Sequence, residues 1–512
     1  MPALPAGLQV RLDAPLPAAL SVGAGTAVFV SGTCHAGSDR IERLTLLVDG
    51  AEQALMAHGM PRLDPLRAGA GPASYRSGFW GMAAVAARGD SAAPVELGLR
   101  ARLAGGGEET AELACIPLAA PVAPAAGAPE VAICMAAYAP PIDLFERQID
   151  SIRAQTHTDW LCIVSDDCSP AESFAAMRDV VADDDRFVLS RSPRRLGFYR
   201  NFERALSLAP AGARYVAMAD QDDAWNPDKL ATLLTAIGDA RLVYSDARIV
   251  GADGRVIADT YWSLRRNNHA EMASLLVTNC VTGAASLFPH ELLYDALPFP
   301  PAQFAHFHDH WIALCALAGG EIRYVDRPLY DYVQHGSAFV GHAKANRMPH
   351  MLQRVASLRR HPRERVRLWR MHYFGDACRL IQFATMLQLR FGERMSAPKR
   401  RALEQFVRGD RSLAPLAGLG VRGAREIVGQ RRETLGGEWM LLHAFGWRHL
   451  VAASARERPQ RRLRLDALPP VALDPTPEAR KPNEWRPVAQ RPRPGGAGSR
   501  DGSAPPVIRT EL

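Results

Sequence analysis

Between residues 131 and 219, short apolar runs alternate with segments whose apolar residues recur at helical spacing. The apolar runs predict buried strands at 131–138, 161–165, 187–190 and 215–219. The helical pattern occupies the stretches between them, near 142–152, 171–182 and 199–208. A helix between two strands returns the chain to the same edge of a sheet, so the strands pair in parallel. The sequence therefore predicts an α/β fold with a mostly parallel sheet and crossover helices.

The first 118 residues have a different pattern. Short strand-like runs recur there, and in 95–103 the apolar residues alternate with polar or small ones. An Asp49-Gly50 pair predicts a tight turn after one of these runs. We expect a β-sandwich over 1–118 that serves as a structural or docking module, with carbohydrate binding as the alternative. A Pro/Ala linker, 119–130, separates it from the α/β domain, 131–342.

Charge divides the chain into an acidic and a basic part. Residues 1–342 hold 27 Lys and Arg against 39 Asp and Glu, whereas 343–454 hold 22 against 8. The basic part mixes apolar and arginine positions at helical spacing, which predicts either a solvated helical surface or a peripheral contact with an anionic membrane. Prolines and arginines dominate 455–512, which predicts a disordered tail. We expect no nucleic-acid partner.

The cysteines and the first residues bear on location. The eight cysteines form no CxxC pair, which favours buried thiols in a reducing compartment. The N-terminus has no basic start followed by an apolar core, and no run of about 18 apolar residues occurs. We therefore expect a cytoplasmic protein, with the inner membrane face as an alternative place.

The stretch MADQDDAWNPDKL carries the most specific chemistry. Asp220, Asp222 and Asp223 follow an apolar run directly, where one helix cap would need a single aspartate. Repulsion disfavours ionising all three carboxylates unless a cation is present. Oxygen ligands of this kind suit Mg²⁺ or Mn²⁺, which completes its shell with substrate phosphate. The sequence has neither G-x-G-x-x-G after the first strand nor a P-loop, so hydride transfer and P-loop chemistry are not indicated.

Three motifs in this order resemble the donor half of family-2 glycosyltransferases with the GT-A fold, especially bacterial rhamnosyltransferase-like members. They are VAICMAAYAPPIDLFERQIDSIRAQTHTDWLCIVSDDCSP, LGFYRNFERAL and YVAMADQDDAWNPDKL, and the resemblance covers about 131–342. It implies that Tyr138 and Asp166-Asp167 hold the nucleotide. It also implies that Asp220 and Asp222 form the DxD pair on metal and diphosphate, with Asp223 an alternative ligand.

The resemblance extends to the acceptor side. Gly283 matches a glycine turn lining the acceptor, Asp309 in HFHDHW matches the catalytic base, and His335 matches a late histidine that completes the metal shell. His308 and Trp311 beside Asp309 are assigned to the acceptor side. Asp309 as a simple helix cap is the alternative. Two residues depart from the family pattern. Cys168 stands where relatives often have glycine in the turn after Asp166-Asp167, and His308 stands where many relatives have glutamate.

These assignments predict an inverting, metal-dependent glycosyltransferase of hexosyl or rhamnosyl type. It would use a nucleoside-diphosphate sugar, Mg²⁺ or Mn²⁺, and a cell-surface glycan or lipid-linked acceptor. Two alternatives remain: a sugar nucleotidyltransferase, and a non-catalytic glycan-binding or scaffold protein. The sugar, the linkage and the acceptor depend on the shape of the pocket.

Overall fold

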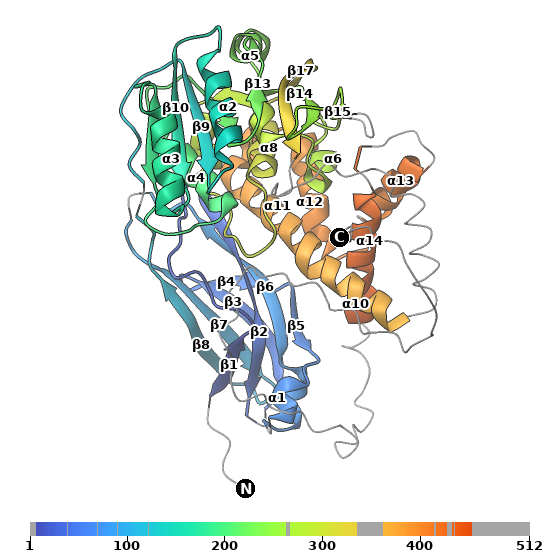
Figure 1. Cartoon of the computed structure of the whole chain (residues 1–512). Helices are drawn as coiled ribbons and strands as arrows, with labels where there is room; N and C mark the ends of the chain where they lie inside the picture. Colours follow the sequence, from blue (N-terminus) through green and yellow to red (C-terminus); the bar gives the residue numbers. More distant parts are fainter. Residues whose placement is uncertain are drawn as a thin grey trace, which may run out of the picture. The chain divides into compact units, whose positions relative to one another are not determined.

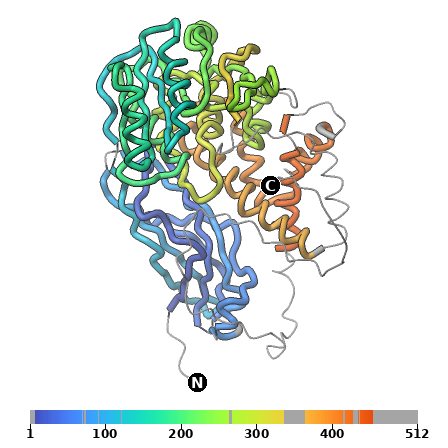
Figure 2. Tube along the Cα trace, in the orientation of Figure 1, coloured from blue at the N-terminus to red at the C-terminus, as the bar shows by residue number. Residues whose placement is uncertain are grey.

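The computed structural model describes residues 7–37, 39–68, 70–89, 91–120, 122–262, 267–334, 362–413, 416–427, 433–434 and 436–452. Residues 1–461 cluster as one compact unit, and Figure 2 traces the chain through it by colour. The predicted tail, 455–512, lies outside the described residues. The predicted domain boundaries at 118, 130, 342 and 454 stay predictions.

The N-terminal part is a β-sandwich, as the sequence predicted. One sheet has the order β1-β2-β6-β5 and the other β4-β3-β7-β8, all pairs antiparallel. The strands are β1 (Leu8–Leu12), β2 (Gly25–Ala36), β3 (Ile41–Val48), β4 (Ala51–Ala54), β5 (Ala57–Met60), β6 (Gly78–Ala86), β7 (Val95–Leu103) and β8 (Glu108–Ile116). A short helix, α1 (Asp64–Arg67), follows β5.

The sandwich forms because alternate residues of its strands face inward. Leu97, Leu99 and Ala101 of β7 are almost fully buried and pack in one apolar cluster with residues of the facing sheet. Asp49 and Gly50 both have positive φ, 50° and 77°, in the two-residue turn between β3 and β4. Positive φ at both positions is the geometry of a hairpin turn, so the predicted turn is confirmed.

The second part is a mixed α/β sheet of nine strands. Its order is β11-β10-β9-β12-β16-β14-β17-β13, with β15 paired to β14. The strands are β9 (Val131–Ala137), β10 (Trp160–Asp166), β11 (Phe187–Arg191), β12 (Tyr215–Ala219), β13 (Ala224–Trp225), β14 (Leu242–Gly251), β15 (Val256–Ala258), β16 (Ser286–Pro289) and β17 (Ile322–Gln334). The first four are parallel, as predicted. Strand β16 is antiparallel to both of its neighbours.

Helices cover this sheet. They are α2 (Ile142–Arg153), α3 (Ala171–Val181), α4 (Phe198–Ser207), α5 (Lys229–Ile237), α6 (Met272–Val277), α7 (Leu292–Ala296) and α8 (His308–Gly319). Figure 1 shows α2, α3 and α4 beside β9 and β10. Helix α2 buries Leu144, Phe145, Ile149 and Ile152, which recur at helical spacing. Helix α8 is apolar on nearly every side and is buried accordingly.

Helices also dominate the described part after residue 362. They are α10 (Pro362–His372), α11 (Cys378–Phe391), α12 (Ala397–Gly409), α13 (Leu416–Ile427) and α14 (Gly437–Gly446), with π-helical turns at Tyr373–Ala377 and Trp447–Ala452. Helix α11 packs on β2 of the sandwich and on α8. In α14, Leu441, Ala444 and Phe445 are buried, so this segment packs in the core. Among the described residues, no helix combines the length and the apolar character needed to cross a membrane.

Buried polar groups join the sandwich to these helices. Nε1 of Trp80, in β6, donates to the hydroxyl of Tyr373 at 3.1 Å, and this hydroxyl in turn donates to Asp410. Arg448 pairs with Asp410 at 3.0 Å and donates to the backbone oxygen of Met56. This buried pair holds the groups of the helical part that contact Trp80 and Met56. The sandwich therefore belongs to the same compact unit as these helices.

Candidate active site

Three loops meet at the carboxyl ends of neighbouring strands. Tyr138 follows β9, and its backbone N–H donates to Oε1 of Gln221, in the loop after β12, at 2.7 Å. The N–H of Ala139 donates to the hydroxyl of Ser169, in the loop after β10, at 2.8 Å. Parallel sheets bind ligands at this edge. Sequence reasoning did not single out Gln221, although it lies inside the aspartate motif.

The loop after β10 carries the predicted nucleotide-binding aspartates. Both carboxylates are buried. Asp166 accepts the N–H of Ser169 at 3.2 Å and lies 3.4 Å from Nε of Arg191. Asp167 accepts the N–H groups of Leu196 and Gly197 at 2.5 and 2.8 Å. Burial raises the pKa of Asp167, although these N–H groups oppose that shift. The two carboxylates hold the loops in place, and their contact with a nucleotide stays a prediction.

Tyr138 has a partner that the sequence did not indicate. The guanidinium of Arg195 lies 3.7 Å from the centroid of the Tyr138 ring. Its Nη1 also donates to the Tyr138 hydroxyl at 2.9 Å. Tyr138 itself is half-buried, so one part of this aromatic and cationic pair remains accessible to a ligand. The motif LGFYRNFERAL comes directly after Arg195, but a single arginine before it carried no recognisable signal.

The backbone conformation of Cys168 explains why relatives often have glycine at this position. Its φ is 59°, in the left-handed region that favours glycine. The turn after Asp167 therefore keeps the backbone shape that a glycine would adopt, with a cysteine in its place.

The three aspartates of the motif have different surroundings. Asp220 and Asp222 are partly exposed, whereas Asp223 is fully buried. Oδ1 of Asp223 accepts the N–H of Val333 at 3.1 Å, and its Oδ2 has no hydrogen-bond partner among the described residues. Burial raises the pKa of Asp220 to about 7, and the negative charges of Asp222 and Asp309 contribute to that shift. This is the repulsion that the sequence predicted.

A buried lysine lies beside these carboxylates. The Nζ of Lys229 is 3.5 Å from the centroid of the Trp225 ring, and it donates to the backbone oxygen of Ala284. Burial lowers the pKa of Lys229, while the charges of Asp223 and Asp220 act in the opposite direction. The sequence analysis passed over Lys229, because a lysine at the start of a predicted helix is usually exposed.

The motif aspartates are the predicted ligands of Mg²⁺ or Mn²⁺. A divalent cation on Asp220 and Asp222 would offset their mutual repulsion, so the residues present fit it. One carboxylate oxygen of Asp223 accepts the N–H of Val333, which leaves the other oxygen for a cation. The predicted ligand His335 lies outside the described residues. In the part of the chain that the structure describes, no three His, Cys, Asp or Glu side chains are grouped as a metal cluster.

Asp309 lies in the first turn of α8, near the motif aspartates. Its Oδ1 accepts the N–H of His310 at 2.6 Å. Hydrogen bonds from the Gly283 backbone and the Asn279 side chain also lower its pKa, but burial prevails and raises that pKa to about 7. The N-cap residue of α8 is Phe307, but the Asp309 carboxylate does accept an N–H of the first turn, so both the base and the helix-stabilising role stay predictions.

Gly283 and His308 meet beside Asp309. A Cβ added at Gly283 would lie 2.7 Å from Nε2 of His308 and 3.5 Å from Cβ of Asp309. The His308 ring stacks on Phe202 with centroids 3.5 Å apart. Neither ring nitrogen of His308 has a hydrogen-bond partner among the described residues, and burial lowers its pKa to about 3. His308 is therefore a neutral, closely packed imidazole.

Trp311 does not face the site, which corrects its assignment to the acceptor side. Its side chain is 0% exposed, and its Nε1 donates to the backbone oxygen of Ala296 at 2.8 Å. The ring stacks on Phe383 of α11. Because α8 is buried on nearly all sides, Trp311 packs in the core.

Gly283→Ala is expected to destabilise the folded state by about 1–3 kcal/mol, because the added methyl group lies against His308 and the start of α8. The measurement is a double-mutant cycle of thermal unfolding with His308→Ala, which removes the ring that the methyl group meets. The cost of Gly283→Ala should be smaller in that background. Equal costs in both backgrounds would show that the contact with His308 is not the cause.

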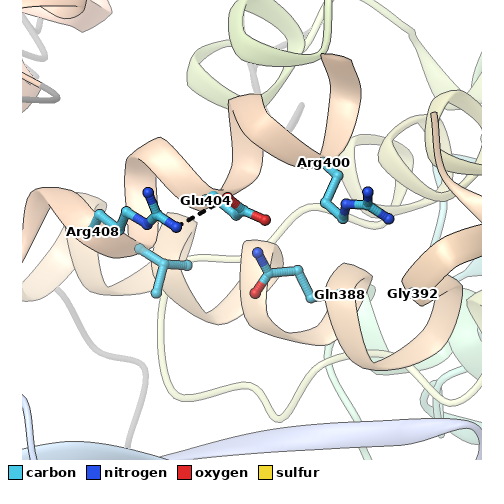
Figure 3. A pocket seen from close by; sticks show the side chains of 6 residues that line it. Gln388, Gly392, Arg400, Glu404 and Arg408 are labelled. Atoms are coloured by element: carbon cyan, nitrogen blue, oxygen red, sulfur yellow. Dashed lines mark ion pairs between the residues drawn. The ribbon is translucent and has the colours of Figure 1, made fainter. Parts of the chain in front are cut away.

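One pocket lies away from the aspartate site. It has a volume of about 350 Å³ and opens between α11 and α12, lined by Gln388, Gly392, Arg400, Glu404, Val407 and Arg408. Figure 3 shows the ion pair between Arg408 and Glu404 at its edge, 3.4 Å long. None of these residues belongs to the aspartate site, so the chemistry described above does not depend on this pocket.

Residues 132–295 match the model of the family described as "Glycosyl transferase family 2". A curated relative is "Uncharacterized protein y4gI" of Sinorhizobium fredii (strain NBRC 101917 / NGR234), 29% identical over 121 residues. The match covers 23% of this chain, and the chain spans only 13% of the length of that relative.

Solved structures with a similar chain path include two glycosyltransferases. Residues 1–349 of TarS from S. aureus, in complex with UDP-GlcNAc, are 14% identical, with 64% of this chain and 91% of that chain covered, at a TM-score of 0.37. The mannosyltransferase PcManGT from Pyrobaculum calidifontis, in complex with GDP-Man and Mn²⁺, is 19% identical, with 64% and 89% covered, at a TM-score of 0.32.

Proposed function

From the match of residues 132–295 to glycosyl transferase family 2, we propose that the protein transfers a sugar from a nucleoside-diphosphate donor to an acceptor hydroxyl. The observation that carries the proposal is the meeting of Asp220 and Asp309 at the carboxyl edge of the sheet, close enough for the charge of Asp309 to raise the pKa of Asp220. Asp220 would act on the side of the leaving diphosphate, and Asp309 would act on the acceptor hydroxyl.

Asp220 and Asp222 are the proposed ligands of Mg²⁺ or Mn²⁺, with Asp223 and His335 as further candidates. When bound, the cation would neutralise charge on the departing diphosphate. Tyr138, with Arg195 over its ring, is the proposed contact for the nucleotide base, and Asp166 and Asp167 shape the loop beside it. The charge of Asp222 contributes to the raised pKa of Asp220, and a bound cation would relieve that repulsion.

Asp309 is the proposed base. Its carboxylate would take the proton of the acceptor hydroxyl while the oxygen forms a bond to the anomeric carbon. The bond from that carbon to the diphosphate breaks on the opposite face, which inverts the configuration. A pKa of about 7 matches this task, because a base is most effective when its pKa lies near the working pH.

The acceptor side is proposed from the residues beside Asp309. Gly283 and His308 lie against Asp309, so an acceptor hydroxyl that reaches Asp309 would pass close to them. We propose a cell-surface glycan or a lipid-linked acceptor. The basic residues of 343–454 are the proposed peripheral contact with an anionic membrane, and failure of the chain to float with anionic liposomes at moderate salt would discard that contact.

The test of the function is a panel of UDP, dTDP, GDP and CMP, each with and without Mn²⁺, read as thermal stabilisation of the whole chain. One nucleoside diphosphate that stabilises only together with Mn²⁺ supports the proposal and indicates the donor class, whereas a response to CMP alone contradicts a diphosphate donor. A panel without any shift contradicts it. Release of pyrophosphate from a nucleoside triphosphate and a sugar phosphate would point to a nucleotidyltransferase instead.

The affinity for Mn²⁺ is expected to increase with pH and to level off above about 7, because Asp220 must lose its proton to bind the cation. Burial is the largest cause of the raised pKa of Asp220. The charges of Asp222 and Asp309 raise this pKa further, and the charge of Lys229 lowers it. Calorimetric titration with Mn²⁺ from about pH 5.5 to 8.5 measures the effect, at most tenfold per pH unit. An affinity that is constant over this range would show that Asp220 is already ionised at its lower end.

A further inference from the structure

A sandwich strand holds the segment that leads to Asp309. The N–H of Phe29, in β2, donates to Oε1 of Gln303 at 2.7 Å, and Nε2 of Gln303 donates to the oxygen of Phe29 at 2.7 Å. Strand β1 pairs only with Gly32–Ala36 of β2. The Gln303 amide therefore binds the backbone of β2 as a neighbouring strand would. Gln303 precedes Asp309 by six residues.

A second link runs through α11. Nε2 of Gln382 donates to the oxygen of Ala27, in β2, at 2.6 Å. Oε1 of the same amide lies 2.9 Å from Nε2 of His306, three residues before Asp309. Gln382 is 0% exposed, and His306 is stacked on Tyr199 and in edge contact with Phe383. His306 is thus fixed to β2 by a single buried side chain.

The upstream end of this segment is held in the same way. Arg390 of α11 is buried, and its Nε donates to the oxygen of Gly25, at the start of β2, at 2.9 Å. Its Nη1 and Nη2 donate to three backbone oxygens between residues 295 and 298, at 2.6 to 2.9 Å. The whole stretch 295–306 is therefore bound to one strand of the sandwich, directly or through α11.

We propose that β2 of the sandwich, together with α11, positions the catalytic base, and that Gln303 and His306 are positioning residues for Asp309. The inference rests on the proposed role of Asp309. Helix α8 begins at His308 and is buried on nearly all sides, so its start follows the segment before it. A carboxylate displaced by about 1 Å costs on the order of a hundredfold in rate, which makes such anchoring matter.

The test is Gln303→Met, which keeps the length of the side chain and removes both amide hydrogen bonds. A matched control exists within the sandwich. Gln53 makes the same pair of bonds with the backbone of Ala84, at 2.6 and 2.9 Å. Gln53→Met should therefore cost similar stability without disturbing the segment before α8. Both variants are compared in the full chain at a temperature where each is folded.

Two readouts separate positioning from stability. The first readout is the release of nucleoside diphosphate from a nucleotide sugar that carries the nucleotide selected by the panel. In Gln303→Met the kcat of this release should be about tenfold to hundredfold lower, with the KM for the donor unchanged. Amide hydrogen exchange of residues 304–311 should be faster in Gln303→Met than in Gln53→Met or in the wild type.

The outcomes are distinguishable. Unchanged kcat and unchanged exchange in Gln303→Met would overturn the proposal. If Gln303→Met does not fold, Gln382→Met cuts the link from Ala27 to His306 and is subject to the same expectations. If the wild type binds no nucleotide, the proposed function fails, and unchanged exchange at 304–311 would still overturn the anchoring by β2.

Discussion

Asp309→Asn is expected to lower kcat about 10²- to 10⁴-fold, the usual contribution of a positioned general base. The amide keeps the shape of the carboxylate but cannot take the proton of the acceptor hydroxyl. An amide oxygen can still accept the N–H of His310, but the amide NH2 group cannot accept the bonds from Gly283 and Asn279, so a loss of stability of about 1–3 kcal/mol is expected and turnover is compared at a temperature where both proteins are folded. Binding of the nucleotide with Mn²⁺ should change little, because Asp309 is not a proposed ligand.

The pH profile provides a second readout for the same residue. The pKa of Asp309 is raised to about 7 by burial, and a base is active only when it is deprotonated. The kcat/KM of the wild type should therefore fall as the pH decreases below about 7. Asp143→Asn is the matched control, because it makes the same change at an exposed carboxylate in the first turn of α2. If Asp309→Asn keeps wild-type turnover, the base is another group.

Asp222→Asn is expected to abolish the Mn²⁺-dependent stabilisation by nucleotide. In the wild type, a ligand at a hundredfold excess over its Kd stabilises the folded state by about 2.7 kcal/mol. Loss of one anionic ligand from a site with two aspartates should remove most of the cation affinity, and the diphosphate would lose its partner. Thermal unfolding with and without Mn²⁺ and nucleotide measures the difference.

Asp239→Asn is the control for this change. Its side chain is 92% exposed, and it pairs with Arg323 on the surface. Surface ion pairs contribute about 0–1 kcal/mol, so this variant should respond to nucleotide and Mn²⁺ as the wild type does. An Asp222→Asn protein that still shows the full cation-dependent shift would mean that the cation binds other groups.

The strands and helices of residues 131–219 could be predicted from the sequence, because their patterns are local. Apolar runs such as 131–138 have no polar position to expose, and 142–152 repeats its apolar residues at the helical period. The element bounds in the structure differ from those predictions by one or two residues at most. The position of Asp220, Asp222 and Asp223 at a strand end followed from the same pattern.

Electrostatic details were not accessible in this way. The raised pKa of Asp309 depends on burial and on hydrogen bonds from residues about 30 positions away in the chain. Lys229 looked like an exposed helix residue, yet it is buried among aromatic rings and carboxylates. Asp228 is the N-cap residue of α5, yet its carboxylate makes no cap hydrogen bond and pairs with Arg327 at 2.5 Å.

The sequence by itself determined the α/β class, the β-sandwich before it, and the strand ends where the aspartates lie, because periodicity and turn residues act over a few positions. Only the tertiary structure decided that Asp309 lies close to Asp220, that Trp311 is a core residue, and that β2 holds Gln303. Those contacts join residues that are 89, 15 and 274 positions apart. Such pairs form only when strands and helices pack, and packing, burial and charge then set what each side chain can do.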